Sequence, residues 1–179
     1  FEARMTPSGK DEVVAVVRDI TNRKSMEREI LQVNKRFTEL AESVSDIFWV
    51  TQPKIRKHLY VNPAFTVITG LSAEAVDNLP NGYLDIVVPE DQHIVIKVRE
   101  QEDNGLKTDT KYRILRPDGS IRWIHDRATP VFDETGNVVR VVGVSSDITE
   151  RLEAEMRLNE SETRFRQIAE TIPEVFWVF

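Results

Sequence analysis

The sequence predicts an α+β fold in which a five-stranded antiparallel sheet carries short helices on one face. The prediction depends on the order of the elements between residues 46 and 149. Strand patterns rich in β-branched and aromatic residues occur at 46–52, 56–62, 108–116, 120–132 and 138–147. Helical patterns fill the interval between the second and the third of these strands. Because strands lie at both ends of the unit, we expect them to pair with each other while the helices cover one face.

Proline, asparagine and glycine mark the expected helix ends. Asn62 is placed to cap a short helix whose first residue is Pro63, and Gly70 ends that helix. A longer helix begins at Pro89, with acidic residues in its first turn, where they favour the helix dipole. Glycine-containing turns typical of hairpins connect the last three strands, with sequences RPDGS at 116–120 and DETGN at 133–137.

The composition narrows the classes of function. The 179 residues carry a net charge of −6, which argues against a nucleic-acid partner because such proteins concentrate basic side chains on one face. Cysteine is absent, which excludes disulfides, cysteine zinc sites and a cysteinyl cofactor adduct. No apolar run approaches the roughly 20 residues that cross a bilayer. We therefore expect no membrane contact in this segment and a cytoplasmic location.

The chain contains a long-period repeat. When residues 13–51 are compared with residues 141–179, a shift of 128 positions, 15 of 39 pairs are identical. Unrelated segments of average composition would share about two or three. Asp-Ile-Thr at 19–21 recurs at 147–149, and Phe-Trp-Val at 48–50 recurs at 176–178. The repeat predicts that the chain is a window on an array of similar domains.

Several motifs, in order, resemble those of a PAS domain followed by its PAC segment. They are YVNPAF at 60–65, GLSAE at 70–74, VPED at 88–91, YR at 112–113, RPDGSIRW at 116–123 and DIT at 147–149. The resemblance is to the variety that has a tryptophan after the DGS turn, and it implies a sheet and helices that enclose a small cavity. Tandem PAS units are usual in sensor histidine kinases and diguanylate cyclases, so the resemblance implies a sensory role in a two-component or related signalling protein.

The repeat and the resemblance together predict the domain organisation. We expect five parts: the C-terminal strands of a preceding PAS/PAC unit (1–21), a connecting helix (22–45), a complete PAS/PAC domain (46–149), a second connecting helix (150–173) and the first strand of a following unit (174–179).

The first connecting helix carries an apolar seam. Steps of four and three residues separate its members, Met26, Ile30, Val33, Phe37, Leu40 and Val44, which is the a/d pattern of a coiled coil. The pattern predicts a homodimer through the helical linkers. The alternative is an amphipathic helix that lies on the sheet of its own domain.

The Asp147-Ile148-Thr149 motif joins the last expected strand to the second helix. We interpret it as a signal-relay joint that makes the strand continuous with the helix. Under the alternative interpretation it is only a good helix cap, with Thr149 at the N-cap position.

Strand alternation and two helices converge on one face of the expected sheet, where a ligand pocket would lie. The candidate lining residues are Trp49, Tyr60, Phe65, Ile94, Tyr112, Arg113, Ile114, Trp123, His125 and Val142. Alternatively, these residues fill the core and leave no cavity, and His125 serves the surface in a cross-strand contact.

The sequence identifies no cofactor, no metal site and no catalytic residue. The three histidines lack metal-ligand spacing, and no phosphate-binding glycine loop or nucleophile motif is present. Haem-binding PAS relatives carry an axial histidine where this chain has Ile96, and the flavin photoreceptors need a cysteine, so the resemblance disfavours haem and flavin.

Three functions remain open. The favoured one is a sensor or relay module that binds a small ligand or passes on a conformational change through its helical linkers. The alternatives are a ligand-free dimerisation or spacer module and a haem- or flavin-bearing redox sensor. The segment itself is not expected to be an enzyme, although the parent protein is expected to be a histidine kinase or a cyclic-dinucleotide enzyme.

Overall fold

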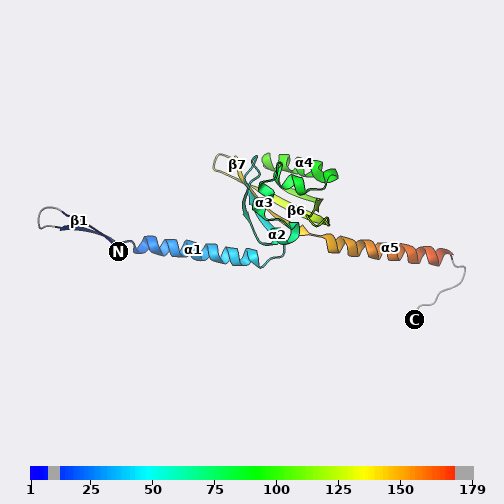
Figure 1. Ribbon diagram of the computed structural model, residues 1–179, viewed down its shortest axis with the longest axis horizontal. Helices are drawn as coiled ribbons and strands as arrows, with labels where there is room; N and C mark the ends of the chain where they lie inside the picture. Colours follow the sequence, from blue (N-terminus) through cyan, green and yellow to red (C-terminus); the bar gives the residue numbers. More distant parts are fainter. Residues whose placement is uncertain (8–12, 172–179) are drawn as a thin grey trace, which may run out of the picture. The chain divides into compact units, whose positions relative to one another are not determined.

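A computed structural model describes residues 1–7 and 13–171, which belong to two compact units, Phe1–Ser43 and Val44–Phe179. Figure 1 shows both units and labels several of their elements. The strand expected at 174–179 lies outside the described residues.

The first unit consists of a hairpin and a helix. Strand β1 (Glu2–Pro7) pairs antiparallel with β2 (Val13–Arg18), and helix α1 follows at Thr21–Glu42. Between strand and helix, the Asp19 carboxylate accepts hydrogen bonds from the N–H of Thr21 (2.9 Å) and from its hydroxyl (2.6 Å). The apolar seam that runs from Met26 to Val44 is exposed, with side chains 38–69% accessible to solvent within the described residues.

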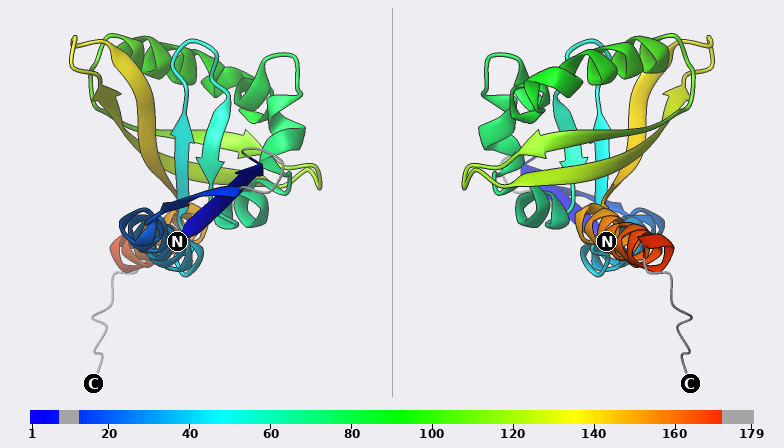
Figure 2. Two further views of the ribbon diagram at one scale, coloured as in Figure 1. Left: turned by 90° about the vertical axis from the view of Figure 1, so that its left-hand side faces the viewer. Right: turned by 90° about the vertical axis from the view of Figure 1, so that its right-hand side faces the viewer.

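The second unit contains the predicted sheet, and its fold class is confirmed. Its strands are β3 (Ile47–Thr51), β4 (His58–Val61), β5 (Thr108–Leu115), β6 (Ile121–Phe132) and β7 (Val138–Asp147). They are ordered β4-β3-β7-β6-β5, and every neighbouring pair is antiparallel. The first and last strands therefore pair at the centre of the sheet, which brings residues far apart in the sequence side by side (Figure 2).

Short helices between β4 and β5 cover one face of this sheet. They are α2 (Ala64–Thr69), α3 (Ala73–Asp77), the 3₁₀ helices η1 (Gly82–Ile86) and η2 (Pro89–Asp91), and α4 (Gln92–Asp103). Buried side chains from these helices pack with Ile47, Tyr112, Ile114 and Ile124 of the sheet. After β7, helix α5 (Thr149–Thr171) leaves the domain with one intervening residue.

Two expected helix starts differ in detail. Pro63, rather than Asn62, occupies the N-cap position of α2. The Asn62 amide oxygen accepts from the Phe48 N–H (3.0 Å) and its amide nitrogen donates to the Asp46 carbonyl (2.9 Å), so it ties the end of β4 to the start of β3. The long helix expected from Pro89 opens with a separate 3₁₀ turn. The Asp91 carboxylate in that turn binds Arg113, and this contact holds the pKa of Asp91 below its usual value.

Candidate functional site

A cavity of about 60 Å³ lies between the inner face of the sheet and the helices. Its wall includes Ile47, Trp49, Thr51, Arg56, His58, Phe65, Tyr83, Val95, Val98, Arg99, Glu102, Tyr112, Asp126 and Ser145. These residues come from all five strands, from the turn between β3 and β4, which carries Arg56, and from α2, η1 and α4. The volume holds roughly four to six water molecules, so a ligand that fits without rearrangement is small.

Aromatic rings form one side of the cavity. The rings of His58 and Phe65 are 5.2 Å apart, those of Phe65 and Tyr83 6.3 Å, and those of Tyr83 and Tyr112 6.3 Å. The Tyr112 hydroxyl lies 3.3 Å from the Tyr83 hydroxyl. Burial raises the pKa of both tyrosines, so both hydroxyls stay protonated and can donate hydrogen bonds at neutral pH.

Asp126 is a buried carboxyl group on the sheet side of the cavity. Its Oδ1 accepts from the Trp49 indole N–H (3.1 Å) and from the Ser145 hydroxyl (2.5 Å). Burial raises the pKa of Asp126 to about 6, and these two hydrogen bonds limit the rise. Three strands, β3, β6 and β7, thus meet at a single carboxyl oxygen.

Gly143 makes room for this cluster. It faces Trp49 across the β3–β7 ladder, and a Cβ atom at position 143 would overlap the indole ring. A residue with a side chain at this position would push the indole away from Asp126 and Ser145.

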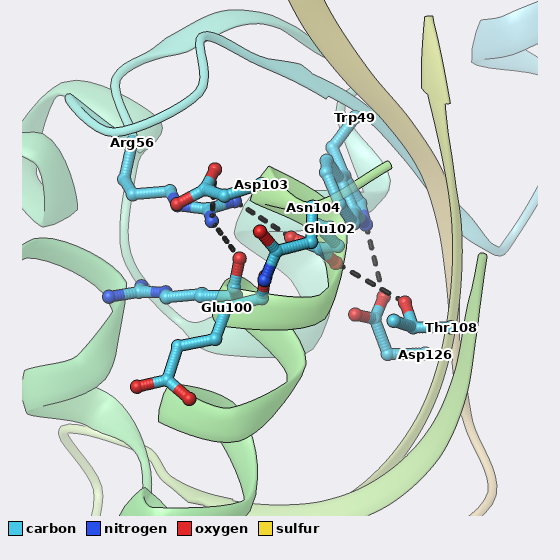
Figure 3. Close-up of polar contacts among 9 residues, drawn as sticks. Trp49, Arg56, Glu100, Glu102, Asp103, Asn104, Thr108 and Asp126 are labelled. Atoms are coloured by element: carbon cyan, nitrogen blue, oxygen red, sulfur yellow. Dashed lines mark hydrogen bonds and ion pairs between the residues drawn. The ribbon is translucent and has the colours of Figure 1, made fainter. Parts of the chain in front are cut away.

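An ion-pair network closes the other end of the cavity (Figure 3). The Arg56 guanidinium pairs with Glu102 (2.7 Å) and with Asp103 (2.8 Å), and it also donates to the Arg99 carbonyl (2.6 Å). Thr108 donates to the second carboxyl oxygen of Glu102 at 3.3 Å. Burial raises the pKa of Glu102, and the charge of Arg56 opposes that rise. The network attaches the β3–β4 turn to the C-terminal end of α4.

The joint between β7 and α5 is hydrogen-bonded to strand β6. The Asp147 carboxylate accepts from the N–H (2.9 Å) and the hydroxyl (2.5 Å) of Thr149. The Thr149 hydroxyl oxygen accepts from the Trp123 N–H (2.8 Å), and the Trp123 carbonyl accepts from the Ile148 N–H (2.9 Å). The Asp–Thr contacts repeat those of Asp19 with Thr21. Thr149 is the first residue of α5, and its hydroxyl binds the neighbouring strand as well as Asp147. Whether the motif relays a signal stays a prediction.

Comparison with known proteins identifies the family. A family model described as PAS fold matches residues 58–145. The five-stranded unit is a PAS domain. An uncharacterized protein from Sinorhizobium fredii is 31% identical over 140 residues, 78% of this chain and 17% of that protein. A blue-light-activated histidine kinase from Brucella ovis is 38% identical over 72 residues, 40% of this chain and 14% of the kinase.

Solved structures agree with this assignment. The sensory box histidine kinase/response regulator structure from Burkholderia thailandensis superimposes with a TM-score of 0.55 at 26% identity, covering 74% of this chain and 98% of that chain. The chain is thus homologous to the sensor domains of signal-transduction proteins. It spans less than a fifth of the length of the two curated relatives named above.

The PAS cavity brings together three of the predicted pocket residues, Trp49, Phe65 and Tyr112. Whether they touch a ligand stays a prediction. Ile114 lies in the core, fully buried, without reaching the cavity wall. Ile94 is half-buried on α4, one position before Val95, which does line the cavity.

The other five predicted pocket residues lie on the opposite face of the sheet, because their strand parity is the reverse of that expected. Tyr60 and Val142 both pair with Val50, the outward neighbour of Trp49. Arg113 lies over the Trp123 ring, 5.5 Å from its centroid. His125 pairs with Asp109 of the neighbouring strand (2.7 Å), which is the cross-strand surface contact considered as its alternative.

Sequence reasoning missed the polar residues of the cavity. In β6 the buried positions are Ile124, Asp126, Ala128 and Pro130, so a period-two reading that starts at Ile124 would have placed Asp126 inside. The large apolar ring of Trp123 instead favoured an alternation that places Trp123 and His125 inside. Arg56 offered no such signal, since its contacts depend on the turn between two strands meeting the end of a distant helix.

The described residues contain neither a helix that could span a membrane nor a cluster of metal-binding side chains. Within residues 1–7 and 13–171, none of the helices has a segment long and apolar enough to cross a membrane. The same residues contain no group of three or more histidine, aspartate or glutamate side chains placed to hold a metal ion.

Proposed function

We propose that this PAS domain is a sensory relay, in which a small ligand in the cavity changes the arrangement of the sheet and thereby of helix α5. The observation that carries the proposal is the hydrogen bonding of the joint to Trp123. Asp126, on the cavity wall, and Trp123, which holds the joint, lie three residues apart on one strand.

A second connection runs through β7. Ser145 donates to Asp126 in the cavity, and Asp147, two residues further along the same strand, binds Thr149 at the start of α5. A ligand that draws Asp126 away from Ser145 would shift both strands that hold the joint. Helix α5 has 23 residues and would carry such a shift about 35 Å along its axis. A ligand can bias the two arrangements only by its difference in affinity for them, about 1.4 kcal/mol for each tenfold ratio.

The parent protein is proposed to be a sensor histidine kinase or a cyclic-dinucleotide enzyme working in the cytoplasm. Support comes from the relatives, which include a blue-light-activated histidine kinase and a diguanylate cyclase with a PAS/PAC sensor. The catalytic activity would then reside in a separate domain, and this segment would regulate it.

The linkers are proposed to pair in a homodimer, with this domain as one unit of a tandem PAS array. The exposed a/d seam of α1 supports pairing, since a lone helix gains nothing from a sustained apolar stripe in water. The similar Asp–Thr hydrogen bonds before α1 and α5 support the array, because they are expected if β2 ends a preceding unit as β7 ends this one. A module that only dimerises and spaces its neighbours would use the same seam but would need no cavity.

The relay is tested by amide hydrogen exchange on the 179-residue chain. Ser145→Ala removes a hydrogen bond to Asp126 inside the cavity, whereas Ser146→Ala changes the neighbouring serine, whose side chain has the opposite parity. Exchange in the first two turns of α5 should change in Ser145→Ala and stay as in the parent in Ser146→Ala. Equal exchange in all three proteins would contradict the relay.

A further inference from the structure

Three polar groups on the cavity wall have unused hydrogen-bonding capacity. The Thr51 hydroxyl is buried and has no hydrogen-bond partner among the described residues. Both hydrogen bonds of the Asp126 carboxyl group go to Oδ1, which leaves Oδ2 for another donor. The Arg99 guanidinium forms no ion pair and no side-chain hydrogen bond with any residue the structure describes. Buried polar groups in proteins are nearly always satisfied, so an occupant is expected beside the buried Thr51 and Asp126. Arg99 is half-buried and lies on the same cavity wall.

The charge of Arg99 is the strongest of these signals. Its neighbour Arg56 is balanced by two carboxylates, Glu102 and Asp103, and the His58 ring is balanced by Asp77 at 2.5 Å. Among the described residues, Arg99 has no carboxylate within ion-pair distance. Burial and the nearby charge of Arg56 lower its pKa, and the more distant charge of Glu102 offsets only part of that effect. An anionic group in the cavity would relieve this cost, and a carboxylate can accept two guanidinium hydrogen bonds at once.

Asp126 sets the second requirement. No ion pair joins Asp126 to Arg99, so the two groups face the cavity separately, with the Tyr83 and Tyr112 rings also on the wall. The free Oδ2 accepts hydrogen bonds, and it favours a cationic donor when the carboxyl group is ionised. A molecule that suits both ends therefore carries an anion and a donor, and the cavity limits it to roughly seven non-hydrogen atoms.

We propose that the cavity binds a small organic acid with a hydrogen-bond donor on the carbon next to the carboxylate, that is, a short 2-amino or 2-hydroxy acid. The carboxylate binds Arg99, the amino or hydroxyl group donates to Asp126, and Thr51 supplies or accepts one further hydrogen bond. This inference rests on the proposed function in taking the cavity as the ligand site, and it adds the chemical class of the ligand.

Calorimetric titration of the 179-residue chain tests the class directly. The probes are L-alanine and L-serine for the 2-amino acids and L-lactate for the 2-hydroxy acids. Propionate lacks the donor and L-alaninamide lacks the carboxylate. At least one of the three acids should bind, and both truncated analogues should bind at least about tenfold more weakly, because each leaves one buried polar group unpaired. Failure of all three acids to bind up to about 10 mM, or equal binding of propionate, overturns the inference.

Two variants locate the binding. Arg99→Gln should weaken the acid at least about tenfold, whereas Lys97→Gln, which removes the same charge from an exposed position of α4, should leave affinity unchanged. Asp126→Asn should reduce any preference for L-alanine over L-lactate, since it removes the negative charge that favours an ammonium group. Unchanged affinity in Arg99→Gln, with circular dichroism showing a folded protein, overturns the assignment.

The outcome separates the ligand class from the relay. Ser145→Ala perturbs the cavity without a ligand. A change in α5 exchange in this variant, together with no binding of any acid, therefore rejects the ligand class alone. Binding of the acids without any change in α5 exchange rejects the relay alone.

Discussion

The main-chain N–H of Trp123 donates to the side-chain hydroxyl of Thr149 at 2.8 Å, so the first residue of α5 is fastened to a strand that is not its own. The Trp123 carbonyl accepts from Ile148 and completes a two-bond clamp. Strand β7 therefore cannot move relative to β6 without altering the start of the helix. A helix attached only through its own strand would be free to swivel about the single residue between them.

Thr149→Val should lower the free energy of unfolding by about 1–3 kcal/mol, because it keeps the shape of the buried side chain but leaves the Trp123 N–H without its acceptor. Thr149→Ser keeps the hydroxyl and should cost much less. Urea denaturation followed by tryptophan fluorescence measures both. Equal losses for valine and serine would mean that the hydroxyl does not hold the joint.

Gly143→Ala should destabilise the domain by about 1–3 kcal/mol, since the added Cβ overlaps the Trp49 indole and forces it from its hydrogen bonds. In a Trp49→Phe background the ring is smaller and has no N–H, so the same change should cost less. A double-mutant cycle measured by urea denaturation tests this coupling. Strictly additive losses would contradict the close packing.

Arg56→Met should cost about 3–5 kcal/mol, because it leaves the buried Glu102 carboxylate without its counter-charge. Adding Glu102→Gln removes the orphaned charge and should restore part of the loss. Thermal and urea unfolding of the single and double variants provide the comparison. A double variant less stable than Arg56→Met would show that Glu102 is satisfied in another way.

The Asp126 carboxyl group should make stability fall as the pH rises. Its pKa is raised to about 6 in the folded domain from an ordinary value of 3.8, so the folded state binds more protons between these values, and the stability it gives at low pH is lost as the pH passes through 6. The cost of ionising it amounts to about 3 kcal/mol in full. The stability of the parent protein minus that of Asp126→Asn, measured from pH 4.5 to 7.5, should therefore decrease and level off above pH 7. A flat difference would refute the shift.

Patterns in the sequence predict the architecture better than the cavity. Strand order and turns follow from local signals such as the RPDGS segment, where Gly119 has a φ of 82°, and the repeated Asp-Ile-Thr marks both joints correctly. The residues that line the cavity are harder to predict, because a strand assigned the wrong alternation has every one of its side chains placed on the wrong face of the sheet. In the β3–β4 pair, moreover, the register shifts between Val50 and Thr51. This shift places both His58 and Val61 of β4 on the inner face, which strict alternation cannot produce.

In the proposed relay, a change in the cavity reaches α5 through the two hydrogen bonds that join Trp123 to Ile148 and Thr149. The most direct measurement is amide exchange at residues 150–156 in Ser145→Ala, made separately in the parent, Thr149→Ser and Thr149→Val backgrounds. Ser145→Ala should alter this exchange in the parent and in Thr149→Ser, which keep the hydroxyl at position 149, and should have no effect in Thr149→Val. An equal effect of Ser145→Ala in all three backgrounds, or no effect in any of them, would contradict the relay through Thr149.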